Sequence, residues 1–240
     1  GENKLSINSP VSESVPEFDH YVKPRSTAFT SDDKIAPASF LGIHLLYGSL
    51  AKVFGNEAIL FFTPFFAAAG IVFFYLLLRR LFSNHIAILS AMLLAVLPPY
   101  WYYASRGMFH NVLFASALIA GLYFLITAIQ TKKHVGYWIS AGLCLGLALI
   151  TRTSEILWVG AAVAILLIAV RKHINWNYAG IGLICMVAVF IPIFIANNAI
   201  YGSPVSFGYT ATSSGSSSTG AGSSAVFTQA VGFILPFGIQ

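Results

Sequence analysis

The fold is decided first by residues 58–78, AILFFTPFFAAAGIVFFYLLL, which carry no charged side chain and are followed directly by Arg79 and Arg80. A helix of about 20 apolar residues crosses the hydrocarbon core of a bilayer. The rest of the 240-residue chain has the same character, because 57% of its residues are hydrophobic, only 9% are charged, and the mean hydropathy is +0.78. Soluble domains carry about 25% charged residues. These values exclude the soluble globular, disordered, collagenous and disulfide-scaffold classes, and they indicate an integral membrane protein.

Further charge-free runs predict five more spans. Together with the first, the predicted spans are 58–78, 86–105, 111–131, 135–151, 156–170 and one within 174–200. The fourth and fifth runs are short, so we expect the turn that joins them, at 151–155, to lie near or slightly below the membrane surface. The sequence therefore predicts an all-α, integral membrane, polytopic bundle with six transmembrane helices.

The basic residues are distributed unevenly among the loops between these spans. Three alternate loops carry two basic residues each and no acid, at Arg79 and Arg80, Lys132 and Lys133, and Arg171 and Lys172. The positive-inside rule assigns these loops to the cytoplasm. Six spans then place the first loop and both ends of this chain on the outer face of the plasma membrane or its luminal equivalent.

The chain divides into three predicted parts. Residues 1–57 are an outer loop, in which apolar residues at helical spacing predict an amphipathic helix at about 40–54 in the membrane interface. Residues 58–200 are the six-helix transmembrane region, and residues 201–240 are an outer Gly/Ser-rich loop with a short apolar segment. Because the chain begins with Gly1 and ends in an apolar stretch, we expect it to be part of a longer protein.

Polar side chains at the outward ends of the predicted spans are candidates for a site, because ionisable groups are costly to place in a membrane. The set consists of Arg106, His110, Asn111, Arg152 and Glu155. A guanidinium at headgroup depth can bind a lipid-linked phosphate through two N–H groups, and a histidine can serve as acid, base or metal ligand. The structural alternatives are snorkelling of Arg106, a hydrogen-bonded loop role for His110, N-capping by Asn111, and an i,i+3 salt bridge between Arg152 and Glu155.

The first loop supplies candidate carboxylates. Asp19 and Asp32 are the candidate catalytic bases that would activate an acceptor. With Glu17 and His20 nearby, Asp19 also offers ligands for a divalent cation; the alternative is a solvated charged surface, and the sequence assigns no metal or cofactor with certainty. The pI near 9.3 arises from short basic clusters between apolar runs, so nucleic acid is not an expected partner.

Several segments, taken in order, resemble the C-type polytopic glycosyltransferases, which include the protein O-mannosyltransferases and the lipid A aminoarabinose transferases. The segments are 37–57, the end of the first span at 75–82, the span-ending pattern at 97–106, and the stretches 142–152 and 197–204. Together they extend over residues 37–208. The resemblance implies a polyprenyl-phosphate sugar donor, an active site on the outer face, and inverting transfer in which a first-loop carboxylate activates the acceptor.

The leading functional hypothesis is therefore transfer of a sugar from a polyprenyl-phosphate carrier to a protein, glycan or lipid acceptor on the outer face, in contact with membrane lipid. In this hypothesis Arg106 and Arg152 flank one outward-facing cavity and hold the leaving phosphate, with Asp19 or Asp32 opposite them.

Two departures from the family pattern keep other functions open. The family's acidic pair after its first helix lies upstream of this chain unless Glu17 and Asp19 replace it, and Asn111 stands where the family has an acid. The alternatives are a membrane transporter or lipid flippase, and a non-catalytic membrane scaffold subunit.

Overall fold

The computed structural model describes residues 27–29, 35–37, 40–131, 134–201 and 203–204. The chain forms two compact units, one made of Phe40–Ala196 and the other of Gly1–Ser39 with Asn197–Gln240. The predicted first-loop candidates Asp19 and Asp32, the basic pair Lys132 and Lys133, and the Gly/Ser-rich segment lie outside the described residues.

The described part of the smaller unit contains a short antiparallel pair of strands, β1 (Thr27–Phe29) and β2 (Ile35–Pro37). Thr27 pairs with Pro37, Ala28 with Ala36, and Phe29 with Ile35. The same unit holds the end of the last helix, where the Asn197 Nδ2 group donates a hydrogen bond to the carbonyl oxygen of Pro204 at 3.1 Å. Strands of three residues are too short to show an alternating apolar pattern, so the sequence does not predict them.

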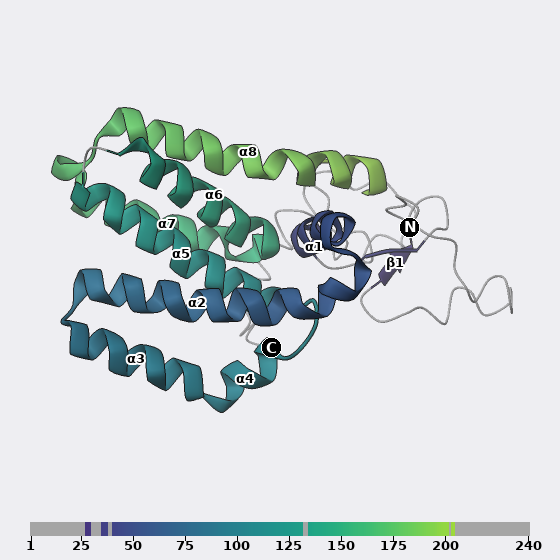
Figure 1. The fold of residues 1–240 in the computed structure, drawn as a ribbon. Helices are drawn as coiled ribbons and strands as arrows, with labels where there is room; N and C mark the ends of the chain where they lie inside the picture. The colour runs from purple at the N-terminus through teal and green to yellow at the C-terminus, as the bar shows by residue number, and fades with distance from the viewer. Residues whose placement is uncertain (1–26, 30–34, 38–39, 132–133, 202, 205–240) are drawn as a thin grey trace, which may run out of the picture. The chain divides into compact units, whose positions relative to one another are not determined.

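The larger unit is helical, as predicted (Figure 1). The elements in chain order are α1 (Leu41–Phe54), η2 (Asn56–Ala58), α2 (Ile59–Leu81), α3 (Asn84–Val96), α4 (Pro98–Ala104), α5 (His110–Thr131), α6 (Val135–Thr151), η3 (Thr153–Glu155), α7 (Ile156–Ala169), η4 (Arg171–His173) and α8 (Trp176–Tyr201).

Three helical segments are long and apolar enough to cross a membrane: Asn56–Leu81, His110–Thr131 and Trp176–Ile200. Two further pairs qualify only when taken together, and each is bent, by 61° between α3 and α4 and by 115° between α6 and α7. The described residues therefore provide three spans, or up to five if each bent pair counts as one. The all-α membrane architecture is confirmed, whereas the number of six spans stays a prediction.

Each break falls at one residue with non-helical backbone angles. Leu97 precedes two prolines and adopts an extended conformation, with φ −68° and ψ 117°, as expected for a residue before proline. The 86–105 run, predicted as one span, is for that reason two helices. Between α6 and α7 the break falls at Arg152, whose φ of −142° and ψ of 84° end α6.

Helix α5 is the central helix of the larger unit. Half of its most apolar stretch is buried inside the unit, compared with 22% for the corresponding stretch of the span that contains α2. One apolar cluster joins α5 and α6 through Leu125, Ala128, Trp138 and Leu145. Close backbone packing continues between α6 and α8, because a Cβ atom at Gly142 would collide with the carbonyl oxygen of Gly182.

Helix α1 runs across the ends of the longer helices and is seen nearly end-on in Figure 1. Its Ile43 and Tyr47 side chains are buried in a cluster with Leu113 of α5. The Tyr47 hydroxyl lies 3.0 Å from the Thr63 hydroxyl of α2. The segment in which the sequence predicts a helix at about 40–54 thus forms one, with its first half packed on α2, α5 and α6 and its end at Val53 and Phe54 exposed.

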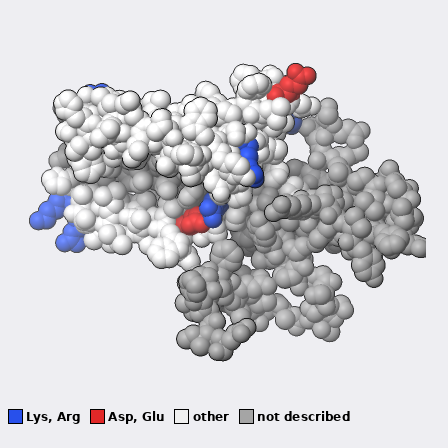
Figure 2. Space-filling view, turned by 90° about the horizontal axis from the view of Figure 1, so that it is seen from below, with Lys and Arg blue, Asp and Glu red and all other residues white. Residues whose placement is uncertain are grey.

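On the face of the larger unit shown in Figure 2, the charged side chains lie toward its two ends and the described surface between them is uncharged. The α2–α3 and α7–α8 turns lie at one end, and α1, the start of α5 and the α6–α7 turn lie at the other (Figure 1). The charged residues described at the first end are all basic: Arg79, Arg80, Arg171 and Lys172. The second end carries both signs, and the candidate site lies there.

Candidate functional site

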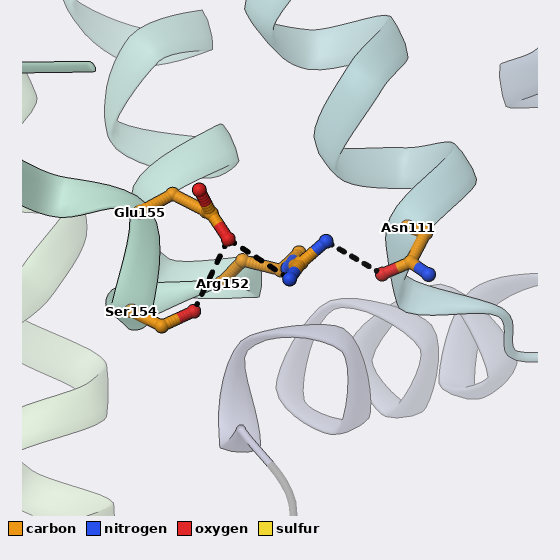
Figure 3. Close-up of polar contacts among 4 residues, drawn as sticks. All are labelled: Asn111, Arg152, Ser154 and Glu155. Atoms are coloured by element: carbon orange, nitrogen blue, oxygen red, sulfur yellow. Dashed lines mark hydrogen bonds and ion pairs between the residues drawn. The ribbon is translucent and has the colours of Figure 1, made fainter. Parts of the chain in front are cut away.

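The site is built around Arg152, at the turn between α6 and α7 (Figure 3). Its Nη1 group donates a hydrogen bond to the Asn111 Oδ1 atom at 3.1 Å. Its Nη2 group forms a 2.9 Å ion pair with the Glu155 Oε1 atom, as the i,i+3 spacing predicts. The two side chains of this ion pair remain 31% and 27% exposed, respectively. Arg152 is therefore held by two partners and still open to solvent on one side.

The local sequence explains why Arg152 is held in this position. The preceding Thr151 is fully buried, and its hydroxyl donates a 2.5 Å hydrogen bond to the carbonyl oxygen of Leu147, which anchors the end of α6. The guanidinium carbon lies 5.6 Å from the centre of the Phe114 ring of α5. Ser154 Oγ lies 3.4 Å from Glu155 Oε1 and donates to it. Packing and hydrogen bonds thus preorganise the guanidinium.

One polar atom of Arg152 has no hydrogen-bond partner within the described part of the chain. Its Nε group is buried from solvent and unpaired. A buried donor without an acceptor costs about 1–3 kcal/mol. An anion with several acceptor oxygens stabilises such a guanidinium by accepting its free hydrogen bonds.

His110 and Asn111 are the first two residues of α5. Asn111 therefore lies inside the first turn, and its side-chain oxygen binds Arg152, so N-capping is not its observed role. The His110 ring stacks on Phe109, with ring centres 5.7 Å apart, and meets the edge of Phe40 at 6.3 Å. Because Asn111 binds Arg152, the adjacent His110 lies close to the Arg152 turn.

His44 is a member of this neighbourhood that the sequence analysis missed. It is half-buried on α1, and its Nδ1 atom lies 3.3 Å from the carbonyl oxygen of Phe40. Burial lowers the pKa of His44 below its ordinary value, against the opposing effect of the hydrogen bond to Phe40. The available sequence signal was a lone histidine next to Ile43 on the buried side of a predicted helix.

Arg106 lies in a different environment from Arg152. It is exposed in the turn after α4, its guanidinium carbon lies 4.3 Å from the centre of the Tyr102 ring, and its Nη2 group donates to the Tyr102 hydroxyl. Within the described residues, the polar contacts of Arg106 and Arg152 have no residue in common. The structure brings Arg152, Asn111 and Glu155 together with His110 beside them, and it does not join Arg106 to that group.

Among the described ranges, no group of three or more His, Cys, Asp or Glu side chains is arranged to hold a metal ion. What the described residues do offer is a guanidinium with an amide, a carboxylate and two imidazoles nearby. This set can bind an anion that competes with Glu155 for Arg152. A phosphate group with a single negative charge and several oxygens has the required chemistry.

Comparison with known proteins identifies the family to which the chain belongs. The family model described as dolichyl-phosphate-mannose-protein mannosyltransferase matches residues 41–195, which extend from α1 through most of α8. Nothing matches the chain among curated proteins or among solved structures. Because the matched residues are well over half of the 240-residue chain, the chain belongs to this family of membrane glycosyltransferases, which use polyprenyl-phosphate-linked sugar donors.

Proposed function

We propose that the protein transfers a sugar from a polyprenyl-phosphate donor to an acceptor on the outer face of the membrane, and that Arg152 binds the donor phosphate. The single observation that carries the proposal is the position of the Arg152 guanidinium. It is fixed by Asn111 and Glu155 at the end of the helices, yet it is 31% exposed and has an unpaired Nε group.

Binding of the donor would exchange one anion for another at Arg152. The exposed ion pair with Glu155 is worth little, about 0–1 kcal/mol, so a phosphate held by two parallel N–H bonds can replace it. Asn111 keeps the guanidinium oriented during the exchange. The planar fork of N–H groups in arginine matches phosphate oxygens, and the ammonium of lysine does not reproduce it.

The remaining candidate residues have complementary proposed roles. Arg106, exposed on Tyr102, attracts the donor phosphate at headgroup depth before it reaches Arg152. A first-loop carboxylate, Asp19 or Asp32, takes the proton of the acceptor hydroxyl. The phosphate then leaves from one side of the anomeric carbon while the acceptor arrives from the other, and this separation produces inversion.

The outer-face assignment is supported by the distribution of charge. The helix end opposite the site carries Arg79, Arg80, Arg171 and Lys172 and no acid among the described residues, as expected for cytoplasmic loops. Impermeant thiol reagents in cells of known membrane orientation test this assignment. We expect labelling of Arg106→Cys from outside and protection of Lys172→Cys; the reverse pattern would overturn the outer-face proposal.

A donor-turnover assay tests the transfer itself. The full-length protein is placed in liposomes with short-chain polyprenyl-phosphate mannose, and release of polyprenyl phosphate is followed with cell-derived acceptor present. We expect turnover by the wild type, a loss of more than about tenfold in Arg152→Lys, and no loss in Arg79→Lys at the opposite end. Wild-type activity in Arg152→Lys would remove Arg152 from the site.

A further inference from the structure

His44 is a titratable side chain of α1 that no motif marks and that the proposed transfer does not yet use. It comes from α1, a different element from the helices that carry Arg152 and His110. Phe40 links the two imidazoles, because its carbonyl oxygen lies 3.3 Å from His44 Nδ1 and its ring centre lies 6.3 Å from that of His110. The same helix packs on the end of α6, where a Cβ atom at Gly42 would collide with the carbonyl oxygen of Ile150, and Arg152 binds Asn111 next to His110. Three elements thus bring one fixed cation and two imidazoles to the same end of the unit.

The hydrogen bond to Phe40 leaves His44 able to accept a proton. A carbonyl oxygen only accepts, so the neutral ring that makes this bond carries its proton on Nδ1. Its Nε2 atom is then the basic nitrogen, and a proton added there leaves the bond to Phe40 intact. Because burial lowers the pKa of His44, the ring is predominantly neutral near pH 7 until an anion arrives.

Few charged residues lie on the elements around the two imidazoles, His44 and His110. On α1 the other charged residue is the exposed Lys52, at the far end of the helix, and η2 contributes the exposed Glu57. On α2 the charges are Arg79 and Arg80, at the opposite end of the unit. Glu155 is the one described carboxylate at the α6–α7 turn, and it is paired with Arg152. If a phosphate displaces Glu155, the imidazoles are the groups that can respond.

The transfer reaction raises the charge that this cluster must bind. When the bond between the anomeric carbon and the phosphate oxygen breaks, the oxygen keeps the electron pair and the phosphodiester becomes a monoester. Its charge then changes from about −1 to nearly −2. The acceptor oxygen forms the new bond to the anomeric carbon, and its proton goes to the carboxylate base. A cation that forms beside the phosphate stabilises the leaving group.

We propose that His44 completes a phosphate-binding cluster with His110 and Arg152, and that its imidazole takes up a proton when a polyprenyl-linked phosphate binds. This inference rests on the proposed function. It adds His44 to the binding site and couples donor binding to the uptake of a proton. It makes binding of the donor stronger at acidic than at alkaline pH, since protons and phosphate bind together.

Calorimetry on the full-length protein in lipid nanodiscs tests the proposal. The probe is short-chain polyprenyl-phosphate mannose, a phosphodiester whose charge is constant between about pH 6 and about pH 8. Titrations in two buffers of different ionisation enthalpy give the number of protons taken up. We expect net uptake by the wild type and an affinity about three- to tenfold weaker at the higher pH.

Two substitutions localise the proton. In His44→Gln, we expect uptake to fall by at least half and the affinity to lose most of its pH dependence. His85→Gln, on α3 at the other end of the unit, is the matched control and should behave as the wild type.

Each adverse result has a distinct meaning. Donor binding and turnover without proton uptake, or full uptake in His44→Gln, would overturn the role of His44 and leave the proposed function standing. Absence of donor binding by the wild type at either pH would overturn both. If His44→Gln does not fold, a wild-type protein that binds the donor without taking up a proton still overturns the proposal.

Discussion

Two turns at the same end of the helices each present one arginine, and their surroundings differ. In the turn after α6, Arg152 is half-buried between Asn111, Glu155 and the Phe114 ring, which come from two separate segments. In the turn after α4, Arg106 is exposed, and the contacts of its side chain are with Tyr102, one helical turn back. Long-range packing therefore holds one guanidinium in place and leaves the other to local contacts.

This difference shows how packing separates two arginines that look alike in sequence. A charge at the membrane surface is screened and mobile, so it contributes to attraction more than to precise binding. A charge fixed in a partly buried position acts in a lower dielectric and needs no reorganisation when its ligand arrives. On this basis we propose that Arg152 binds the donor phosphate and that Arg106 assists the approach of the donor.

The largest expected effect on stability and transfer comes from separating α1 from the Arg152 turn. A Cβ atom at Gly42 would collide with the main-chain carbonyl of Ile150, two residues before Arg152. We expect Gly42→Val to destabilise the protein by about 3 kcal/mol and to abolish most transfer. Gly48→Val on the same helix is the control, because a Cβ there meets nothing within 4 Å. Thermal unfolding in detergent gives the comparison, and equal midpoints for both variants would contradict the close packing of α1 on α6.

A smaller effect is expected when Arg152 loses its partner on α5. In Asn111→Ala the guanidinium loses the 3.1 Å hydrogen bond that orients it. We expect donor affinity to fall about fivefold, equivalent to about 1 kcal/mol. The matching change in the other turn is Ser105→Ala, which removes an exposed hydrogen bond to Tyr102 and should leave affinity unchanged. Equal losses in the two variants would mean that the two turns do not differ in binding.

The smallest expected effect is on stability, and it comes from removing the hydrogen bond that joins α1 to α2. Tyr47 is fully buried, and its hydroxyl pairs with Thr63 at 3.0 Å; burial raises the pKa of this hydroxyl, so it stays protonated at any physiological pH. Tyr47→Phe should cost about 1 kcal/mol of stability. Tyr75→Phe, which loses an exposed hydrogen bond to Asn84, should cost less. The two unfolding midpoints measure the difference, and a larger loss in Tyr75→Phe would be the unexpected result.

Much of the fold follows from the order of apolar runs. The predicted spans 58–78, 111–131 and 174–200 correspond to α2, α5 and α8, because long charge-free runs leave the backbone no other way to satisfy its hydrogen bonds in a bilayer. Local rules also explain the break at Leu97, although the sequence analysis treated 86–105 as one span. The strands at 27–37 are too short to produce a pattern.

The site was only partly predictable, for a physical reason. Arg152 and Glu155 are three residues apart, so local geometry alone predicted their ion pair. The contact between Arg152 and Asn111 joins residues 41 positions apart and depends on how α5 packs against α6. The position of His44 depends in the same way on where α1 docks. No local spacing rule contains this information, so Arg106 and Arg152 could not be distinguished before the packing was known.

Donor binding by the two arginine variants tests the central claim most directly. The affinity of the full-length protein for short-chain polyprenyl-phosphate mannose is measured for the wild type, Arg152→Lys and Arg106→Lys under one set of conditions. The account predicts a loss of more than about tenfold for Arg152→Lys and of less than about threefold for Arg106→Lys. Equal losses, or a greater loss for Arg106→Lys, would contradict it.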